Sequence, residues 1–97
     1  MFSKVYIVGD ITDAFSVRTQ NKFNEAQKKL EKLNILVFNP IESYLVSSAS
    51  KEEAIKYNLK RLLNANAVYV LNDSEVPKNS VEIVLAMKLN LIIMHEF

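Results

Sequence analysis

Four short runs of apolar, mostly β-branched residues divide the chain, and polar residues do not alternate within them. The runs cover residues 4–8, 35–38, 67–71 and 91–94. An apolar run without alternation is typical of a strand buried on both faces, as in a parallel sheet that helices cover on each side. The pattern therefore predicts four buried strands.

Helical periodicity fills the three segments between these runs. Ser16 is the predicted N-cap of a helix that ends near residue 33, and Ser50 with Glu53 forms a capping-box pattern that opens a second helix. A third helix is predicted from residue 79 or 80 to about residue 89. The expected core-facing stripes are Phe23, Ala26, Leu30 and Leu33 in the first helix and Ile55, Leu59, Leu62 and Leu63 in the second.

The third predicted helix is apolar almost all round. Its apolar positions are Val81, Ile83, Val84, Leu85, Ala86 and Met87. A helix of this kind is buried on more than one side. In a domain this small, a second copy of the chain is the expected cover, which predicts a homo-oligomer.

The alternation of strands and helices predicts the fold class. With right-handed crossovers it gives an α/β fold with a doubly wound, four-stranded parallel sheet in the order 2-1-3-4 and helices on both faces, of the Rossmann or flavodoxin type. The 97 residues fit one domain, 1–97. Ligands of such sheets bind at the carboxyl ends of the strands where the strand order reverses, here between the first and third strands.

Composition and charge exclude several classes of function. The chain has no cysteine and one histidine, His95, which we expect at the surface, so neither a metal site nor a Ser-His-Asp triad is predicted. Its net charge of +1, with ten lysines and two arginines, offers no electrostatic footprint for nucleic acid. No apolar run reaches the roughly 18 residues of a membrane span, and the N-terminus lacks a signal-peptide pattern. We expect a soluble cytoplasmic domain.

Several residues are placed by the predicted topology at the edge where ligands bind. Gly9 is the only glycine of the chain, which suggests a positive φ or a close approach of the backbone to a ligand. There is no GxGxxG fingerprint and no P-loop, so no nucleotide cofactor is predicted. Lys78 and Ser80 could hold an anion at the start of the third helix, or be a surface lysine and a capping serine. The predicted substrate-binding set is Gly9, Asp10, Ile11, Thr12, Asp73, Ser74, Lys78 and Ser80.

Glu82 is the most informative candidate for chemistry. It stands in the first turn of the apolar third helix, on the stripe that it shares with Ala86 and Leu89. The helix dipole favours its ionised form, and an ionised carboxylate in a small pocket can act as a nucleophile or a general base. The alternative is structural, because acidic residues are common in first turns for the same electrostatic reason.

Asn58 and Tyr6 are polar groups at positions predicted to be buried. Asn58 lies on the buried stripe of the second helix, where its amide either lines the ligand crevice or is a hydrogen-bonded core amide. Tyr6 lies on the first strand, where it is either a site residue or a core tyrosine whose hydroxyl finds a partner.

Together these residues resemble a known family. The resemblance is to the nucleoside 2-deoxyribosyltransferase-like superfamily. The residues that carry it are Tyr6-Ile-Val-Gly9 at the end of the first strand, Asn39-Pro40 after the second, a polar residue eight positions before Asn66, and Glu82-x-x-x-Ala86. The closest resemblance is to the short phage-type members that are filed as a domain of unknown function.

The resemblance implies a small doubly wound domain that forms oligomers with sites at subunit contacts. It implies cleavage of the N-glycosidic bond of a 2′-deoxynucleoside or its 5′-monophosphate, with transfer of the deoxyribosyl group to a base or to water. The nucleophilic glutamate of the family falls on Glu82, and its strand tyrosine falls on Tyr6. The chemistry needs no cofactor or metal, and the implied partner is a nucleoside or nucleotide.

Departures from the family pattern motivate alternative functions. Gly9-Asp10 stands where the family often has Gly-Pro, Asn58 where it has an acid, and Asn66 where it has Asp. The segment 76–79 replaces a Ser-x-Gly-Ala stretch. The main alternative is a nucleotide- or nucleoside-binding module that keeps the pocket and has lost the chemistry, and a third is a plain interaction domain.

Overall fold

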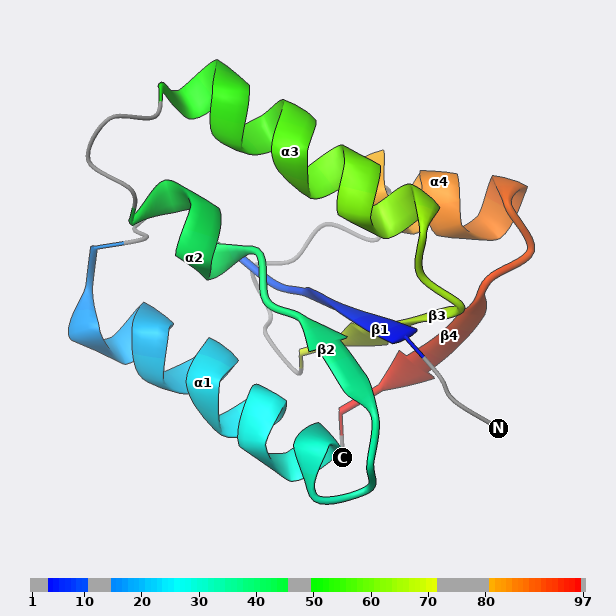
Figure 1. Ribbon diagram of the computed structural model, residues 1–97, viewed down its shortest axis with the longest axis horizontal. Helices are drawn as coiled ribbons and strands as arrows, with labels where there is room; N and C mark the ends of the chain where they lie inside the picture. Colours follow the sequence, from blue (N-terminus) through cyan, green and yellow to red (C-terminus); the bar gives the residue numbers. More distant parts are fainter. Residues whose placement is uncertain (1–3, 11–14, 46–49, 72–80, 97) are drawn as a thin grey trace.

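The computed structural model describes residues 4–10, 15–45, 50–71 and 81–96, without the side chains of Tyr44 and Lys51. Strands and helices alternate along the chain (Figure 1). The strands are β1 (Lys4–Val8), β2 (Leu36–Phe38), β3 (Ala67–Val70) and β4 (Ile92–His95). The helices are α1 (Val17–Glu31), α2 (Ile41–Tyr44), α3 (Lys51–Leu63) and α4 (Val81–Lys88).

The four strands form one parallel sheet in the order β2-β1-β3-β4, which confirms the predicted fold class and strand order. Val8 of β1 pairs with Val70 of β3, so both strands leave the sheet at the same level. The strand order reverses between β1 and β3, because the chain moves outward to β2 after β1 and to β4 after β3. The predicted ligand-binding edge therefore exists in the sheet.

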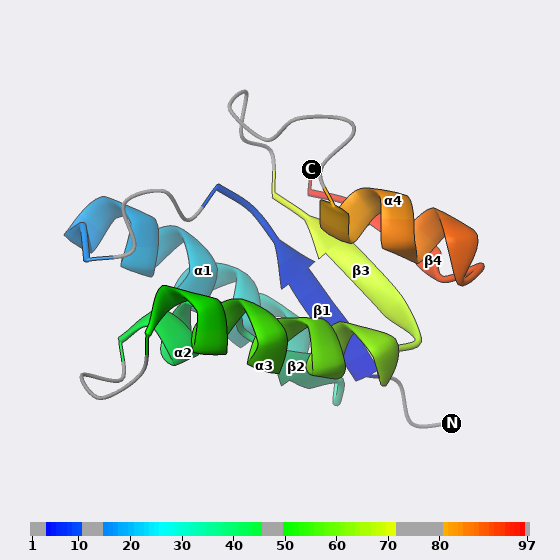
Figure 2. The same cartoon turned by 90° about the horizontal axis from the view of Figure 1, so that it is seen from above.

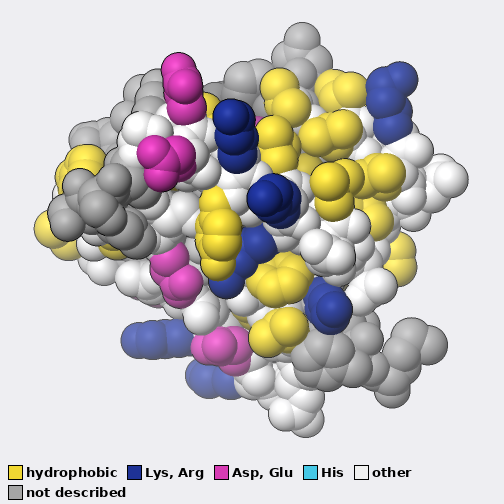
Figure 3. Space-filling view, turned by 45° about the horizontal axis from the view of Figure 1, so that its top comes forward, with side chains coloured by type: hydrophobic (Ala, Val, Ile, Leu, Met, Phe, Trp, Pro, Cys, Tyr) yellow, Lys and Arg dark blue, Asp and Glu magenta, His cyan; other side chains and the backbone are white. Residues whose placement is uncertain are grey.

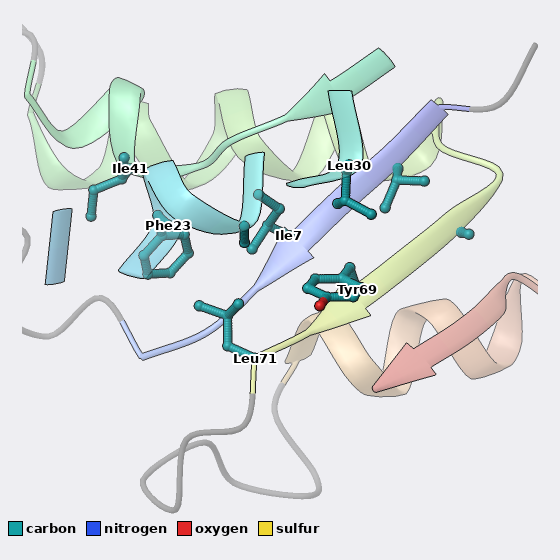
Figure 4. Close-up of a cluster of buried hydrophobic side chains, with 9 residues drawn as sticks. Ile7, Phe23, Leu30, Ile41, Tyr69 and Leu71 are labelled. Carbon is teal, nitrogen blue, oxygen red and sulfur yellow. The ribbon is translucent and has the colours of Figure 1, made fainter. Parts of the chain in front are cut away.

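Helices cover the sheet on both faces, with α3 and α4 on one side and α1 on the other (Figure 1). Each layer has its own core. On one face, Val5 and Ile7 of β1 pack with Phe23, Ala26 and Leu30 of α1 (Figure 4). The alternate residues of the same strand point to the other face. They form a second cluster with α3 and α4, whose members include Tyr6, Val8, Leu62, Val68 and Ala86.

Capping side chains fix where the long helices begin, as predicted. Ser16 accepts a hydrogen bond from the Thr19 backbone N–H at 3.3 Å, and Ser50 accepts one from the Glu53 N–H at 3.1 Å. Left-handed residues follow the ends of α1 and α4, where Asn34 has a φ of 60° and Asn90 a φ of 57°. Asparagine tolerates this conformation better than most other residues, so it ends both helices in this nearly glycine-free chain.

Three predictions about burial are wrong. The outer strands β2 and β4 are only partly buried, because each is an edge strand with one neighbour. Leu33, Ile55 and Leu63 are 67%, 40% and 58% exposed rather than buried. The buried stripe of α3 consists of Ala54, Asn58 and Leu62.

The short helix α2 was not predicted from the sequence. Its four residues after a proline are too few to show a helical period of apolar positions. No helix within the described ranges is long and apolar enough to cross a membrane.

Candidate functional site

The site expected from the topology lies where β1 and β3 end. The Leu71 backbone N–H donates a hydrogen bond of 2.8 Å to the Val8 carbonyl, which keeps the two strands together up to their last residues. Gly9 and Asp10 leave the sheet beside Leu71, and both are partly buried. Parallel strands bring the following segments to one edge, so a ligand bound there meets the start of both loops.

Gly9 is required by packing. Its φ is not positive, which corrects one of the two reasons expected from the sequence. A Cβ at this position would lie 2.7 Å from the Cδ1 of Leu71 and 2.8 Å from the Cζ of Phe23, far inside van der Waals contact. The close approach at Gly9 is therefore made by two buried core side chains.

Replacing Gly9 by alanine is expected to lower the free energy of unfolding by about 1–3 kcal/mol, because the added methyl group overpacks the core. Urea unfolding followed by circular dichroism measures the change. The double variant Gly9→Ala/Leu71→Ala, which removes the nearer neighbour, should lose less stability than the sum of its single changes. Full additivity of the two losses would contradict the contact.

Glu82 lies in the first turn of α4, one turn before the fully buried Ala86. Residues four apart share one side of a helix, so Glu82 lies toward the sheet and is itself partly buried. Because α4 connects two parallel strands, it runs against them and begins at their carboxyl edge (Figure 2). The carboxylate therefore stands at the level where β1 and β3 end.

Burial raises the pKa of the Glu82 carboxyl above its usual value, and a hydrogen bond to its own backbone opposes the shift in part. The sequence suggested the opposite direction, since the dipole of α4 favours the ionised form. Desolvation is the larger effect here. A carboxylate with a raised pKa at a ligand-binding edge is a recurrent property of functional sites.

Tyr6 is 2% exposed and occupies the same layer as Glu82. Its side chain belongs to the cluster between the sheet and helices α3 and α4, together with Leu62 and Ala86. Its strand neighbours are Phe38 and Val68. The structure thus places Tyr6 and Glu82 on the same face of the sheet.

Asn58 is buried, and its amide is hydrogen-bonded at both ends. Its Oδ1 accepts a hydrogen bond of 2.8 Å from the Ser43 hydroxyl, and its Nδ2 donates one of 3.2 Å to the Pro40 carbonyl. These bonds hold α2 against α3 beyond the end of β2. They agree with the structural alternative for Asn58.

A second buried amide was missed from the sequence. Asn39 is 1% exposed, and its Nδ2 donates to Oε1 of Gln27 at 2.9 Å and to Oδ1 of Asn24 at 3.2 Å. Its Oδ1 accepts from the Ile41 N–H at 3.1 Å. Asn followed by Pro before a short helix was the available signal, because asparagine often bonds the backbone two residues on.

Asn66 lies far from the predicted site along the strand. It precedes β3, where its Oδ1 accepts a hydrogen bond of 2.9 Å from the Lys4 backbone N–H. This contact ties the amino ends of β1 and β3, at the edge of the sheet opposite to Gly9. The amide at position 66 therefore lies away from the carboxyl edge, where the candidate site is expected.

Other predicted site residues lie outside the described residues. These are Ile11, Thr12, Asp73, Ser74, Lys78 and Ser80. His95 is exposed on β4, as expected. No cluster of three or more potential metal ligands occurs in the part of the chain that the structure describes.

Solved structures with the same fold were found by comparison. The 2-deoxyribosyltransferase from Bacillus psychrosaccharolyticus superposes with a TM-score of 0.75 at 20% identity, over 96% of this chain and 71% of the enzyme. A conserved protein from Enterococcus faecalis V583 superposes with a TM-score of 0.69 at 17% identity, over 98% of this chain and 63% of that protein. Identities this low establish the shared fold.

The sequence also matches one family over nearly its full length. No curated protein matches it significantly. The model of a domain of unknown function, DUF4406, covers residues 3–95. The chain therefore belongs to this family of domains of unknown function, and it has the fold of a nucleoside 2-deoxyribosyltransferase.

Proposed function

We propose that this chain cleaves the N-glycosidic bond of a 2′-deoxynucleoside or its 5′-monophosphate, with Glu82 as the nucleophile. The observation that carries the proposal is the partly buried Glu82 carboxylate in the first turn of apolar α4, at the carboxyl edge of the sheet. The solved 2-deoxyribosyltransferase with this fold supports the same class of substrate.

The proposed reaction has two steps, as in a retaining glycosidase. A carboxylate oxygen of Glu82 forms a bond to C1′ of the sugar while the C1′–N bond breaks, and the base nitrogen takes the electron pair and then a proton from solvent. Water or a nitrogen of a second base then forms a bond to C1′ while the bond from C1′ to the Glu82 oxygen breaks, which restores the carboxylate. The attacking group loses its proton to solvent. Tyr6 would position the sugar or the nucleophile, and Gly9 and Asp10 would border the substrate.

A binding module without catalysis is the second candidate, and Asn58 favours it. The amide that stands at the acidic position of the family is committed to Ser43 and to the Pro40 carbonyl, and it cannot transfer a proton. Such a module would be stabilised by nucleotides through mass action without forming product.

The remaining predictions from the sequence extend this proposal. We expect a homo-oligomer, because α4 leaves Val81 and Met87 62% and 61% exposed. The phage origin and the cytoplasmic location stay predictions, as do the contacts of the substrate-binding residues at positions 11, 12, 73, 74, 78 and 80.

One assay separates the two candidates. The protein is incubated with the four deoxynucleosides and their 5′-monophosphates, with and without a second free base, and base release is followed by chromatography. We expect release by the wild type and a loss of at least about 1,000-fold in the Glu82→Ala variant, as for other covalent nucleophiles. Dependence on the second base identifies a transferase, and independence a hydrolase.

The other outcomes are equally informative. Release by both proteins would keep the reaction and reject Glu82 as the nucleophile. Intact substrate in both samples, with a thermal shift on addition of nucleotide, would establish the binding module. Without either product or shift, both candidate functions would be wrong.

A further inference from the structure

The only histidine of the chain lies at the carboxyl edge of the sheet. His95 is the last residue of β4, and it pairs with Val70, the last residue of β3. Val70 pairs in turn with Val8, which ends β1. These three residues form a row across the sheet at the ends of their strands, which is where ligands bind in doubly wound sheets.

The register of the strands decides on which face of the sheet His95 lies. Residues paired across parallel strands point to the same face, and Val8 and Val70 both belong to the cluster between the sheet and helices α3 and α4. Ile93 packs against the same cluster, and a residue two positions further along a strand points the same way. His95 is therefore on the face that α4 covers, which is the face of Glu82.

Glu82 and His95 stand at different heights along the sheet. The Leu91 backbone N–H donates a hydrogen bond of 2.9 Å to the Ala86 carbonyl, which places the buried part of α4 beside the start of β4. Glu82 lies one turn back along α4 from Ala86, or about 6 Å toward the carboxyl edge. His95 lies about 13 Å beyond Leu91 toward the same edge. The imidazole thus stands about 7 Å nearer the edge than Glu82, which leaves room for a nucleobase between them.

The imidazole of His95 is exposed, and its ring nitrogens are available. Its neighbour Val70 is buried in a central strand, whereas β4 is an edge strand. Within the described ranges His95 makes no hydrogen bond and no ion pair. Figure 3 looks onto the outer side of α3 and α4 and shows apolar and basic side chains there, with no histidine among the described residues in view. The imidazole therefore lies apart from that outer side, and a ligand bound at the carboxyl edge can meet it.

We propose that His95 contacts the base of the bound nucleoside and donates the proton with which that base leaves. As the Glu82 oxygen forms its bond to C1′, the bond from C1′ to the base nitrogen breaks and its electron pair stays on the base. A ring N–H of the His95 imidazolium passes its proton to the base, which leaves neutral. The neutral imidazole then takes a proton from the water or second base that attacks C1′. His95 thus replaces solvent in both proton transfers.

This inference rests on the proposed function and adds a general acid to it. The amide of Asn58 cannot supply the proton, and it is already bonded to Ser43 and to the Pro40 carbonyl. Imidazole suits both steps, because it is the side chain that ordinarily gains and loses a proton near neutral pH. As the only histidine of the chain, His95 is the residue that can perform this exchange.

Two classes of substrate test the proton donation, because they differ in whether the base needs a proton to leave. The bases of the ordinary 2′-deoxynucleosides are neutral in the substrate, whereas the base of 7-methyl-2′-deoxyguanosine is already cationic and leaves without a proton. His95→Ala should lose about 100- to 10,000-fold in base release from the ordinary substrates, the usual contribution of general acid–base catalysis. On the cationic substrate its rate should stay within about threefold of the wild type.

Two control variants accompany His95→Ala. Ile92→Ala changes a residue of the same strand that is 66% exposed and lies on the opposite face, with Met94, so both rates should be unchanged. Glu82→Ala removes the nucleophile, so both rates should be lost. Circular dichroism verifies that each variant is folded. Equal losses on both classes of substrate in His95→Ala, or no loss on either, would overturn the proton donation.

A binding measurement distinguishes a failure of this inference from a failure of the proposed function. Because the chain has one histidine, the imidazole C–H signals in its proton NMR spectrum belong to His95 alone. Each of the four 2′-deoxynucleoside 5′-monophosphates is added to the Glu82→Ala variant, and we expect at least one of them to shift these signals.

The outcomes of the two measurements separate as follows. Base release by the wild type without any NMR shift would overturn the role of His95 and leave the proposed reaction in place. A shift without base release would keep the contact between His95 and the nucleotide and reject the reaction, together with the proton donation. Neither shift nor release would overturn both.

Discussion

Replacing Phe23 by alanine is expected to lower the free energy of unfolding by about 3–5 kcal/mol, the usual range for a fully buried phenylalanine. Phe23 is 0% exposed and lies at the centre of the cluster between α1 and the sheet (Figure 4). Its ring also packs against Gly9, whose Cα has room for a hydrogen atom but not for a methyl group. Truncation would leave a cavity directly beside Gly9.

Urea unfolding of the variant measures this loss. Because small domains have only about 5–15 kcal/mol of stability, Phe23→Ala can unfold the protein. Phe23→Leu is therefore measured beside it and should lose a smaller amount, since most of the volume is kept. The matched control is Phe15→Ala, which removes the same ring from a position that is 75% exposed. Equal losses at both positions would contradict the proposed role of Phe23.

The strands and their order in the sheet could be predicted from the sequence. The central strands β1 and β3, which contain Val5, Ile7 and Tyr69, each have a neighbouring strand on both sides. A continuous apolar run is typical of strands in that position. The outer strands have similar runs but one neighbour each. Composition could not distinguish them, because an edge strand differs from a central one only in what lies beside it.

The helices show a different limit of the sequence pattern. In α3, the large residues Ile55 and Leu63 suggested the buried stripe, whereas the small Ala54 and the polar Asn58 occupy it. Asn58 is buried because Ser43 and Pro40 satisfy its amide, and both belong to another segment. Periodicity within one helix carries no information about such partners.

The same limit applies to the candidate site. Position in the predicted topology made Glu82 and Tyr6 candidates, because topology decides which residues reach the carboxyl edge and which face of β1 they occupy. Their roles in the site come from the family resemblance and stay predictions. The direction of the pKa shift at Glu82 could not be predicted. It depends on how much protein surrounds the carboxylate, and the sequence showed only the opposing helix dipole.

The pH dependence of base release is the second large effect that we expect. Glu82 must be ionised to attack C1′, so the rate should fall about tenfold for each pH unit below the pKa of Glu82. Because burial raises this pKa, the decline should begin at a higher pH than for an exposed glutamate. Single-turnover rates across the acidic range measure the profile. A rate that is constant down to the ordinary pKa of glutamate would contradict the assignment.

The raised pKa of Glu82 also makes the stability of the fold depend on pH. An activity assay does not measure the direction of this dependence. A carboxyl whose pKa is higher in the folded state than in the unfolded state binds more protons when folded, so stability is greatest at low pH and falls as the pH rises through the folded-state pKa. Glu82→Gln removes this titration. The variant should therefore gain stability relative to the wild type as the pH rises from acidic to neutral.

Urea unfolding of both proteins at several pH values measures this difference, with Glu52→Gln in the exposed first turn of α3 as the control. If Glu82→Gln abolishes base release and stabilises the fold at neutral pH, the carboxylate is held in a position that opposes folding. A glutamate at position 82 would then not be explained by a contribution to stability. It would be explained by the chemistry of the site. A variant that is less stable than the wild type at neutral pH would instead make Glu82 a structural residue of α4.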